Sequence, residues 1–262
     1  MNAWLLQSAA LATYRHPVTQ RFLRTRLGSV SFVRAYDLYK EFVETPGNHA
    51  LARRIPPRSW VIDIGANIGF FTERFAKWTA DGGRVIAVEP DAHNVMLLKQ
   101  RLARREIKSV DVLQAAAAEF NGTIYLQRNP DHPGDHRISD KGEAVASITI
   151  DQVIEQAGNP DVALIKIDTQ GSERRVLQGA SKTLRRCKPA LFIEVDDAAL
   201  RQFGTTAAEL LDELTAMQYQ LYRISRSGNE TPISREGAMT ALMSEDRGYL
   251  DLLCVLTRSL SP

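Results

Sequence analysis

From Trp60 onward, short apolar runs alternate with longer segments in which hydrophobic residues recur every three or four positions. Runs of four to eight aliphatic and β-branched residues predict buried strands, and the three-to-four spacing predicts helices. Seven strands are expected, over residues 60–64, 84–88, 110–113, 163–167, 190–194, 219–224 and 250–256. A further run at 123–126 follows the turn dipeptide Asn121-Gly122 and is expected to be one arm of a local hairpin.

Between these strands the sequence predicts helices over residues 70–78, 91–105, 172–186 and 206–217. Asp91 is a suitable N-cap, and Thr206 with Glu209 has the spacing of a capping box. Alternation of strand and helix is typical of a mostly parallel sheet covered by helices on both faces. We therefore expect a doubly wound α/β domain with a seven-stranded sheet.

Two regions depart from this alternation. Residues 1–57 contain helix-like stretches separated by Pro and Gly breaks, so we expect a helical N-terminal extension that precedes a main domain over 58–262. Residues 129–143 are polar and show no apolar period, which predicts a long loop. A loop of that length inside a compact domain is usually functional or disordered.

Composition excludes several classes of protein. The chain is 44% hydrophobic and 24% charged, which is ordinary for a globular protein. Cys187 and Cys254 are too few for a disulfide framework or a zinc site, and their apolar surroundings favour reduced thiols in a cytoplasmic protein. No apolar run reaches the roughly 18 residues of a transmembrane segment, and residues 1–11 lack the basic start of a signal peptide.

The charge is unevenly distributed along the chain. The net charge is +2, but residues 1–59 hold nine Lys and Arg against three acids, and the remainder holds 24 against 28. The small net charge argues against a dedicated nucleic-acid binder, so nucleic acid is not an expected partner. The basic segment is interpreted either as a solvated helix, which could also form a homodimer, or as a surface that meets an anionic substrate, partner or membrane face.

The most informative segment is residues 61–69, Val-Ile-Asp-Ile-Gly-Ala-Asn-Ile-Gly. Asp63 lies at the carboxyl end of a strand, Gly65 permits a positive φ, and Gly69 lets the next helix pack closely. The spacing differs from the Gly-x-Gly-x-x-Gly of a pyrophosphate site. A nucleotide that carries an amine and a carboxylate fits better, with Asp63 at the ammonium and the helix N-terminus at the carboxylate. S-adenosylmethionine is such a molecule.

Three further acids, Glu89, Asp168 and Glu194, end strands at the same edge of the predicted sheet. Glu89 is placed to accept hydrogen bonds from both ribose hydroxyls of a nucleotide. Asp168 is interpreted as a carboxylate near the sulfonium and the acceptor, as a metal ligand, or only as a helix cap. Glu194 belongs either to the same site or to a satisfied sheet edge.

Four motifs together resemble the FkbM-type methyltransferases, over residues 63–72, 88–91, 165–180 and 191–194. These are class I, S-adenosylmethionine-dependent enzymes, many of which methylate hydroxyl groups of sugars and natural products. The resemblance covers about residues 59–224, and its most specific block is Lys-Ile-Asp-x-x-Gly-x-Glu, in which Thr169-Gln170 stands where the family more often has Val-Glu. It implies a cofactor site, with Ala116 beside the adenine, made by Asp63, Gly65, Ala66, Asn67, Gly69, Glu89, Ala116 and Asp168.

Methyl transfer to a hydroxyl needs an aligned acceptor and is helped by a positioned base. The candidate bases are Asp168, Glu194 and His136, and Asp135 could raise the basicity of His136. Asp168 and Glu194 could instead hold a divalent cation that acidifies the hydroxyl, but two carboxylates without a third ligand make a metal the less favoured reading.

The expected function is therefore O-methylation, with S-adenosylmethionine as the cofactor and a sugar, glycan or secondary metabolite as the acceptor. One alternative is a methyltransferase that acts on RNA or another anionic acceptor docked by the basic N-terminal segment. Another is a non-catalytic partner protein that only binds S-adenosylmethionine. A nucleotide-dependent oxidoreductase is disfavoured because the Gly-x-Gly-x-x-Gly turn is absent.

Overall fold

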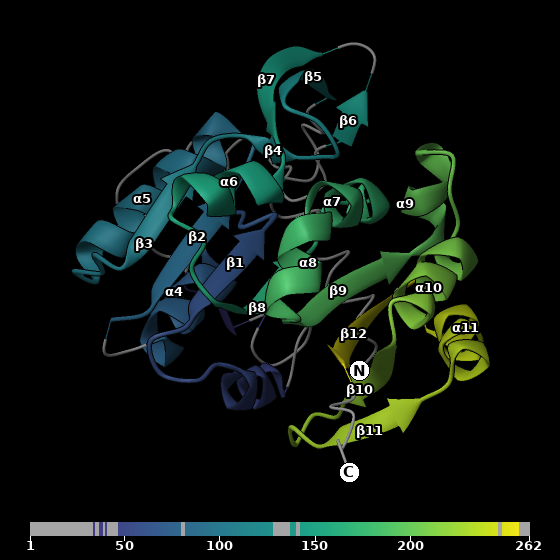
Figure 1. Ribbon diagram of the computed structural model, residues 1–262. Helices are drawn as coiled ribbons and strands as arrows, with labels where there is room; N and C mark the ends of the chain where they lie inside the picture. Colours follow the sequence, from purple (N-terminus) through teal and green to yellow (C-terminus); the bar gives the residue numbers. More distant parts are fainter. Residues whose placement is uncertain are drawn as a thin grey trace.

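The structure is a computed structural model that describes residues 34, 37, 38, 40, 47–79, 82–127, 137–139, 142–245 and 248–256. Its centre is an eight-stranded sheet with helices on both faces (Figure 1). The strand order is β11-β10-β12-β9-β8-β1-β2-β3. The strands are β1 (Trp60–Ile64), β2 (Arg84–Val88), β3 (Val110–Leu113), β8 (Val162–Ile167), β9 (Ala190–Asp196), β10 (Tyr219–Ile224), β11 (Glu230–Ile233) and β12 (Tyr249–Leu256).

The sheet is parallel from β3 to β9, and β12, β10 and β11 add to it in antiparallel orientation. From β1 the chain runs outward to β2 and β3, then returns to place β8 on the other side of β1. In open α/β sheets, ligands bind beyond the carboxyl ends of the strands at such a change of direction. The topology therefore puts the ends of β1, β2 and β8 at a site.

All seven predicted strands are present, but the predicted strand number is wrong by one. The additional strand, β11, pairs with β10 in antiparallel register, with Pro232 opposite Tyr222. Proline has no N–H to donate, so it is tolerated only where one side of a strand is unpaired. Because β11 is the edge strand, its polar, proline-containing sequence forms a strand that the hydrophobic pattern did not indicate.

Both predicted helix caps are confirmed, and one predicted helix is divided into two. Asp91 caps α5, and Thr206 forms the capping box of α10. The helix expected over 172–186 is divided at Ala180 into α7 and α8, because Asp151 accepts hydrogen bonds from the backbone N–H groups that begin α8. The helices are η2 (Asn48–Arg54, a 3-10 helix), α4 (Phe70–Trp78), α5 (Ala92–Arg104), α6 (Ile150–Gln156), α7 (Glu173–Gly179), α8 (Ser181–Cys187), α9 (Asp197–Gln202), α10 (Ala207–Ala216) and α11 (Arg235–Ser244).

A second, smaller sheet projects beyond the main one at the top of Figure 1. Its order is β4-β7-β5-β6, with β4 (Ala116–Ala117), β5 (Gly122–Gln127), β6 (Arg137–Ser139) and β7 (Glu143–Ile148). The predicted hairpin arm is β5. The prediction of a loop over 129–143 is wrong at residues 137–139, which form the strand β6. This strand forms through backbone pairing with β5, which does not require an apolar sequence pattern.

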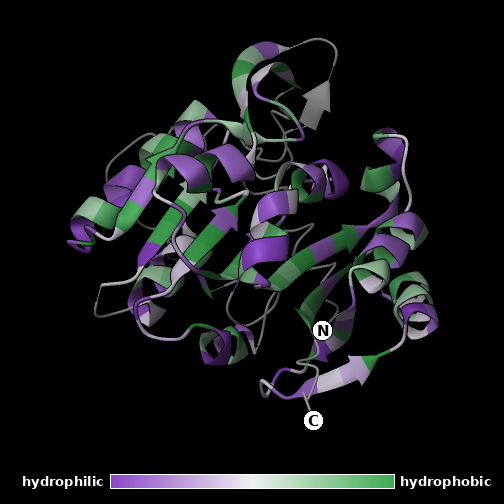
Figure 2. Ribbon diagram, in the orientation of Figure 1, coloured by the Kyte–Doolittle hydropathy of each residue, from purple (hydrophilic) through white to green (hydrophobic). Residues whose placement is uncertain are grey.

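The hydrophobic core lies on both faces of the main sheet. One cluster packs the sheet against α6, α7, α8, α10 and α11, and a second, rich in phenylalanine, packs it against α4 and η2. Figure 2 shows hydrophobic residues concentrated in the strands and hydrophilic residues on the outer sides of the helices. In the described part of the chain, no helix has the length and apolar content to cross a membrane.

Candidate active site

The turn after β1 is held tightly against two neighbouring strands. Gly65 and Gly69 have φ values of +73° and +88°. A Cβ atom on Gly65 would lie 1.8 Å from the carbonyl oxygen of Asp168, and one on Gly69 would lie 2.2 Å from Cδ1 of Leu98. Both positions therefore need glycine for conformation and for space. Ala66 completes the anchoring, since its N–H donates to the carbonyl of Val88.

Asn67 and Glu89 meet beside this turn, as their predicted shared site requires. The backbone N–H of Asn67 donates to Oε2 of Glu89 at 2.8 Å, and Oε1 accepts from Asp91 N–H and the Asn94 amide. Glu89 is only 5% exposed. Burial raises the pKa of Glu89 to about 7, although these three hydrogen bonds oppose the rise.

Asp63 lies beneath the turn and is fully buried. Its Oδ2 accepts a hydrogen bond of 2.6 Å from the hydroxyl of Thr72. Its Oδ1 lies 3.5 Å from Nζ of Lys166 and has no hydrogen-bond donor among the described residues. Burial raises the pKa of Asp63, against the opposing effects of Lys166 and Thr72.

Lys166 connects the glycine turn to Asp168. This lysine is 3% exposed, and its Nζ lies 3.3 Å from Oδ2 of Asp168 and 3.2 Å from the Gly65 carbonyl oxygen. Burial lowers the pKa of Lys166, but the carboxylates of Asp168 and Asp63 outweigh it and raise the pKa above its ordinary value. No role was predicted for Lys166 from the sequence. The available signal was a lysine inside an otherwise apolar strand, which must find a charged partner when buried.

Asp168 and Glu194 are brought together by an amide. Nε2 of Gln170 donates to Oδ1 of Asp168 at 3.3 Å and to Oε1 of Glu194 at 3.1 Å. Burial raises the pKa of Asp168, but Lys166 and Lys40 outweigh it, so the pKa is lowered. Asp168 is not the cap of the following helix, because the N-cap position of α7 belongs to Ser172.

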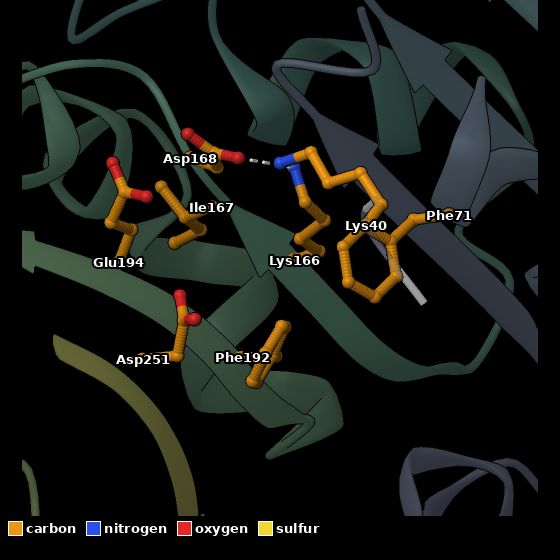
Figure 3. Close-up of a pocket in the computed structure, with 8 residues that line it drawn as sticks. All are labelled: Lys40, Phe71, Lys166, Ile167, Asp168, Phe192, Glu194 and Asp251. Atoms are coloured by element: carbon orange, nitrogen blue, oxygen red, sulfur yellow. Dashed lines mark ion pairs between the residues drawn. The ribbon is translucent and has the colours of Figure 1, made fainter. Parts of the chain in front are cut away.

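Lys166, Asp168 and Glu194 line a pocket at the carboxyl edge of the sheet, shown in Figure 3. The rings of Phe71 and Phe192, with centroids 5.6 Å apart, form an apolar wall. Asp251 lies opposite Glu194 in the pairing of β12 with β9. Both lysine side chains reach toward Asp168 in Figure 3. The full lining is Lys40, Phe71, Lys166, Ile167, Asp168, Phe192, Glu194 and Asp251.

The N-terminal extension contributes to this region. Asp37 pairs with Arg101 of α5 at 2.7 Å, and Arg101 also binds Glu73 of α4 at 2.7 Å. Three residues after Asp37, Lys40 lines the pocket. The contact between Asp37 and Arg101, which are 64 residues apart, was not predicted from the sequence. The basic residues Arg21, Arg24 and Arg26 of this segment lie outside the described part of the chain.

Two candidate residues remain, Ala116 and His136. Ala116 is buried in β4, past the end of β3, and pairs with Ser147 of β7. His136 lies outside the described residues, so the structure does not place this candidate base. Within the described ranges, no group of three or more His, Cys, Asp and Glu side chains is arranged to hold a metal ion.

Comparisons with known proteins identify the family. A family model of the methyltransferase FkbM domain matches residues 63–221, more than half of the chain. The solved FkbM methyltransferase of Methylobacillus flagellatus KT is 23% identical, with a TM-score of 0.47, over 75% of this chain and 43% of its own length. This chain therefore spans less than half of that protein.

Two other solved structures match nearly all of their own length. An rRNA methylase from Streptococcus thermophilus is 14% identical over 82% of this chain and 99% of its own, with a TM-score of 0.46. A SAM-dependent methyltransferase from Aquifex aeolicus is 13% identical over 86% and 97%, with a TM-score of 0.47. A search of curated proteins finds no match. On the family model, this chain belongs to the FkbM methyltransferases, whose methyl donor is S-adenosylmethionine.

Proposed function

We propose that this chain methylates a hydroxyl group of a sugar, glycan or secondary metabolite with S-adenosylmethionine. The observation that supports this acceptor most directly is the pocket of Figure 3, where carboxylates and an apolar wall lie beside the glycine turn. Carboxylates accept hydrogen bonds from hydroxyl groups, and aromatic rings pack against apolar faces of a ligand.

The residues at the turn fit the cofactor. Gly65 leaves no side chain at the ends of β1 and β8, and Oδ1 of Asp63 has no hydrogen-bond donor among the described residues. We propose that Asp63 faces the ammonium group, that Glu89 holds the ribose hydroxyls, and that Ala116 lies at the adenine. When bound, S-adenosylmethionine supplies an electrophilic methyl group on a sulfonium.

Among the candidate bases, the contacts favour Glu194 over Asp168. Asp168 is paired with Lys166, and two lysines lower its pKa, so it is a weak proton acceptor. Glu194 lines the same pocket and accepts a hydrogen bond from the amide of Gln170. We therefore propose that Glu194 accepts the hydroxyl proton. His136 stays a candidate for the same role.

The alternative of RNA or another anionic acceptor has one observation in its favour, because Lys40 brings a positive charge from the basic N-terminal segment to the pocket. The same pocket is lined by Asp168, Glu194 and Asp251, however. Three carboxylates repel a phosphate at short range. We therefore rank an anionic acceptor second.

Titration calorimetry with S-adenosylmethionine, S-adenosylhomocysteine and NAD tests the cofactor assignment. We expect micromolar binding of the first two and no binding of NAD. A screen of sugars, glycans, hydroxylated natural products and RNA, measured by release of S-adenosylhomocysteine, then tests the acceptor class. Turnover with RNA and with no other acceptor would contradict the proposed acceptor class. If S-adenosylmethionine did not bind, the proposal that the glycine turn forms the cofactor site would be wrong.

A further inference from the structure

The amide of Gln170 occupies an unusual place between two carboxylates. Only a nitrogen can donate to carboxylate oxygens, so the orientation of the amide is determined by its partners, Asp168 and Glu194. The two carboxylate oxygens lie 3.3 Å and 3.1 Å from the same Nε2 atom, which has two hydrogens to offer. Both N–H groups of one side chain therefore have an acidic acceptor.

The backbone of Gln170 has a strained conformation. Gln170 has a φ of +56°, in the left-handed region that a non-glycine residue adopts only with strain. The turn is fixed by the buried carboxylate of Glu173, whose Oε1 accepts from the N–H groups of Thr169 and Gly171 at 3.0 Å and 3.1 Å. Because Glu173 holds the residues on both sides, the Gln170 side chain is directed back over the strand ends.

Two neighbouring carboxylates repel each other unless a proton, a cation or hydrogen-bond donors lie between them. We propose that Gln170 is a positioning residue that holds Asp168 and Glu194 together through its amide, so that Glu194 keeps its orientation at the pocket. Its effect on turnover rests on the function proposed above. Its effect on the two carboxylates does not depend on that function.

The substitution Gln170→Glu tests the arrangement without any acceptor. It would place a third carboxylate between Asp168 and Glu194, and three clustered carboxylates form a site that favours a hard divalent cation such as Mn²⁺. Gln218→Glu is the matched control. Gln218 is also a glutamine with a positive φ, +68°, but it lies exposed in the turn between α10 and β10.

The probe is Mn²⁺ alone, measured by calorimetry and by its paramagnetic resonance signal on the full chain. We expect Gln170→Glu to bind one Mn²⁺ at least about tenfold more tightly than the unchanged chain, and Gln218→Glu to behave like the unchanged chain. Equal Mn²⁺ binding by Gln170→Glu and Gln218→Glu would overturn the proposal. So would stoichiometric binding by the unchanged chain that Asp168→Asn abolishes, because a cation would then join the carboxylates.

Gln170→Ala tests the consequence for turnover, with the acceptor found in the screen. We expect kcat to fall by about a hundredfold, while the KM for the acceptor and the affinity for S-adenosylhomocysteine stay unchanged. An unchanged kcat, or a loss that appears only in KM, would overturn the positioning role. If the unchanged chain methylates none of the acceptors, the proposed function fails. The Mn²⁺ comparison then still tests whether Gln170 lies between Asp168 and Glu194.

Discussion

At the scale of single residues, the site depends on charges that have little contact with water. Lys166 lies between the carboxylates of Asp63 and Asp168, and each member of the group is stabilised by its partners rather than by solvent. Removing one partner from a buried ion pair leaves an uncompensated charge, which costs far more than the pair contributes as a whole.

Lys166→Met measures this dependence. The substitution removes the cation beside the fully buried Asp63 and one of the two lysines beside Asp168, so we expect the free energy of unfolding in urea to fall by about 3–5 kcal/mol. Lys182→Met, at an exposed position on α8, is the control and should change it by less than about 0.5 kcal/mol. If both variants were equally stable, Lys166 would not neutralise the two carboxylates.

Glu89→Gln tests the raised pKa of Glu89, about 7 in the folded chain against an ordinary 4.5. The folded state binds this proton more tightly than the unfolded state, so the stabilisation is present below pH 4.5 and is lost as pH rises through 7. Between about pH 4.5 and pH 8, we expect the unchanged chain to lose about 3 kcal/mol of stability relative to Glu89→Gln. Urea unfolding across this range makes the comparison, and parallel stability curves would show that Glu89 has an ordinary pKa.

At the scale of elements, the turn between β1 and α4 packs directly against the ends of β2 and β8. Gly65 contacts the backbone of Asp168 so closely that a methyl group has no space there. The turn therefore connects the proposed cofactor site with the end of β8, where Asp168 lies. A change in this turn should affect both.

Gly65→Ala separates crowding from backbone strain when it is compared with Gly204→Ala. Both glycines have a φ of +73°, but nothing lies within 4 Å of a Cβ built on Gly204. Both variants incur the left-handed strain of about 1–2 kcal/mol, and Gly65→Ala should lose at least about 2 kcal/mol more through crowding. Equal losses in thermal or urea unfolding would mean that the turn relaxes away from Asp168.

At the scale of the whole molecule, the N-terminal extension is anchored to the main domain beside the site. Asp37 binds Arg101, which is 6% exposed and also pairs with Glu73. These contacts join the extension, α5 and α4. They place Lys40 where it lines the pocket with residues from β8, β9 and β12.

Asp37→Asn measures how strongly the extension is anchored. Hydrogen bonds to a buried charged group contribute about 1.5–3 kcal/mol, and we expect a loss of that size in unfolding free energy. Asp212→Asn is the control, because Arg235 and Asp212 form a similar pair at 2.8 Å on an exposed surface and such pairs contribute less than about 1 kcal/mol. Similar losses in the two variants would mean that the anchor is no stronger than a surface ion pair.

Much of the fold and the cofactor side of the site could be predicted from the sequence. The strands and most helix boundaries follow from the spacing of apolar residues. Asp63, Glu89, Asp168 and Glu194 reach one edge because each lies at or near the carboxyl end of a strand of the same sheet, although β9 continues two residues past Glu194, to Asp196. Polar strands such as β6 and β11 were missed, because they form through pairing with a neighbour rather than through their own hydrophobic pattern.

What the sequence determined by itself is therefore local: the elements, their caps, the glycine turn and the motif residues that define the family. Only the tertiary structure decided which distant side chains meet. Lys40 from the N-terminal segment and Asp251 from an antiparallel strand line one pocket, and Gln170 from a strained turn binds two of its carboxylates. Helices and strands form according to the residues that are neighbours in sequence, so a sequence pattern can predict them. The pairing of buried charges depends on which strands and helices the packed core brings together.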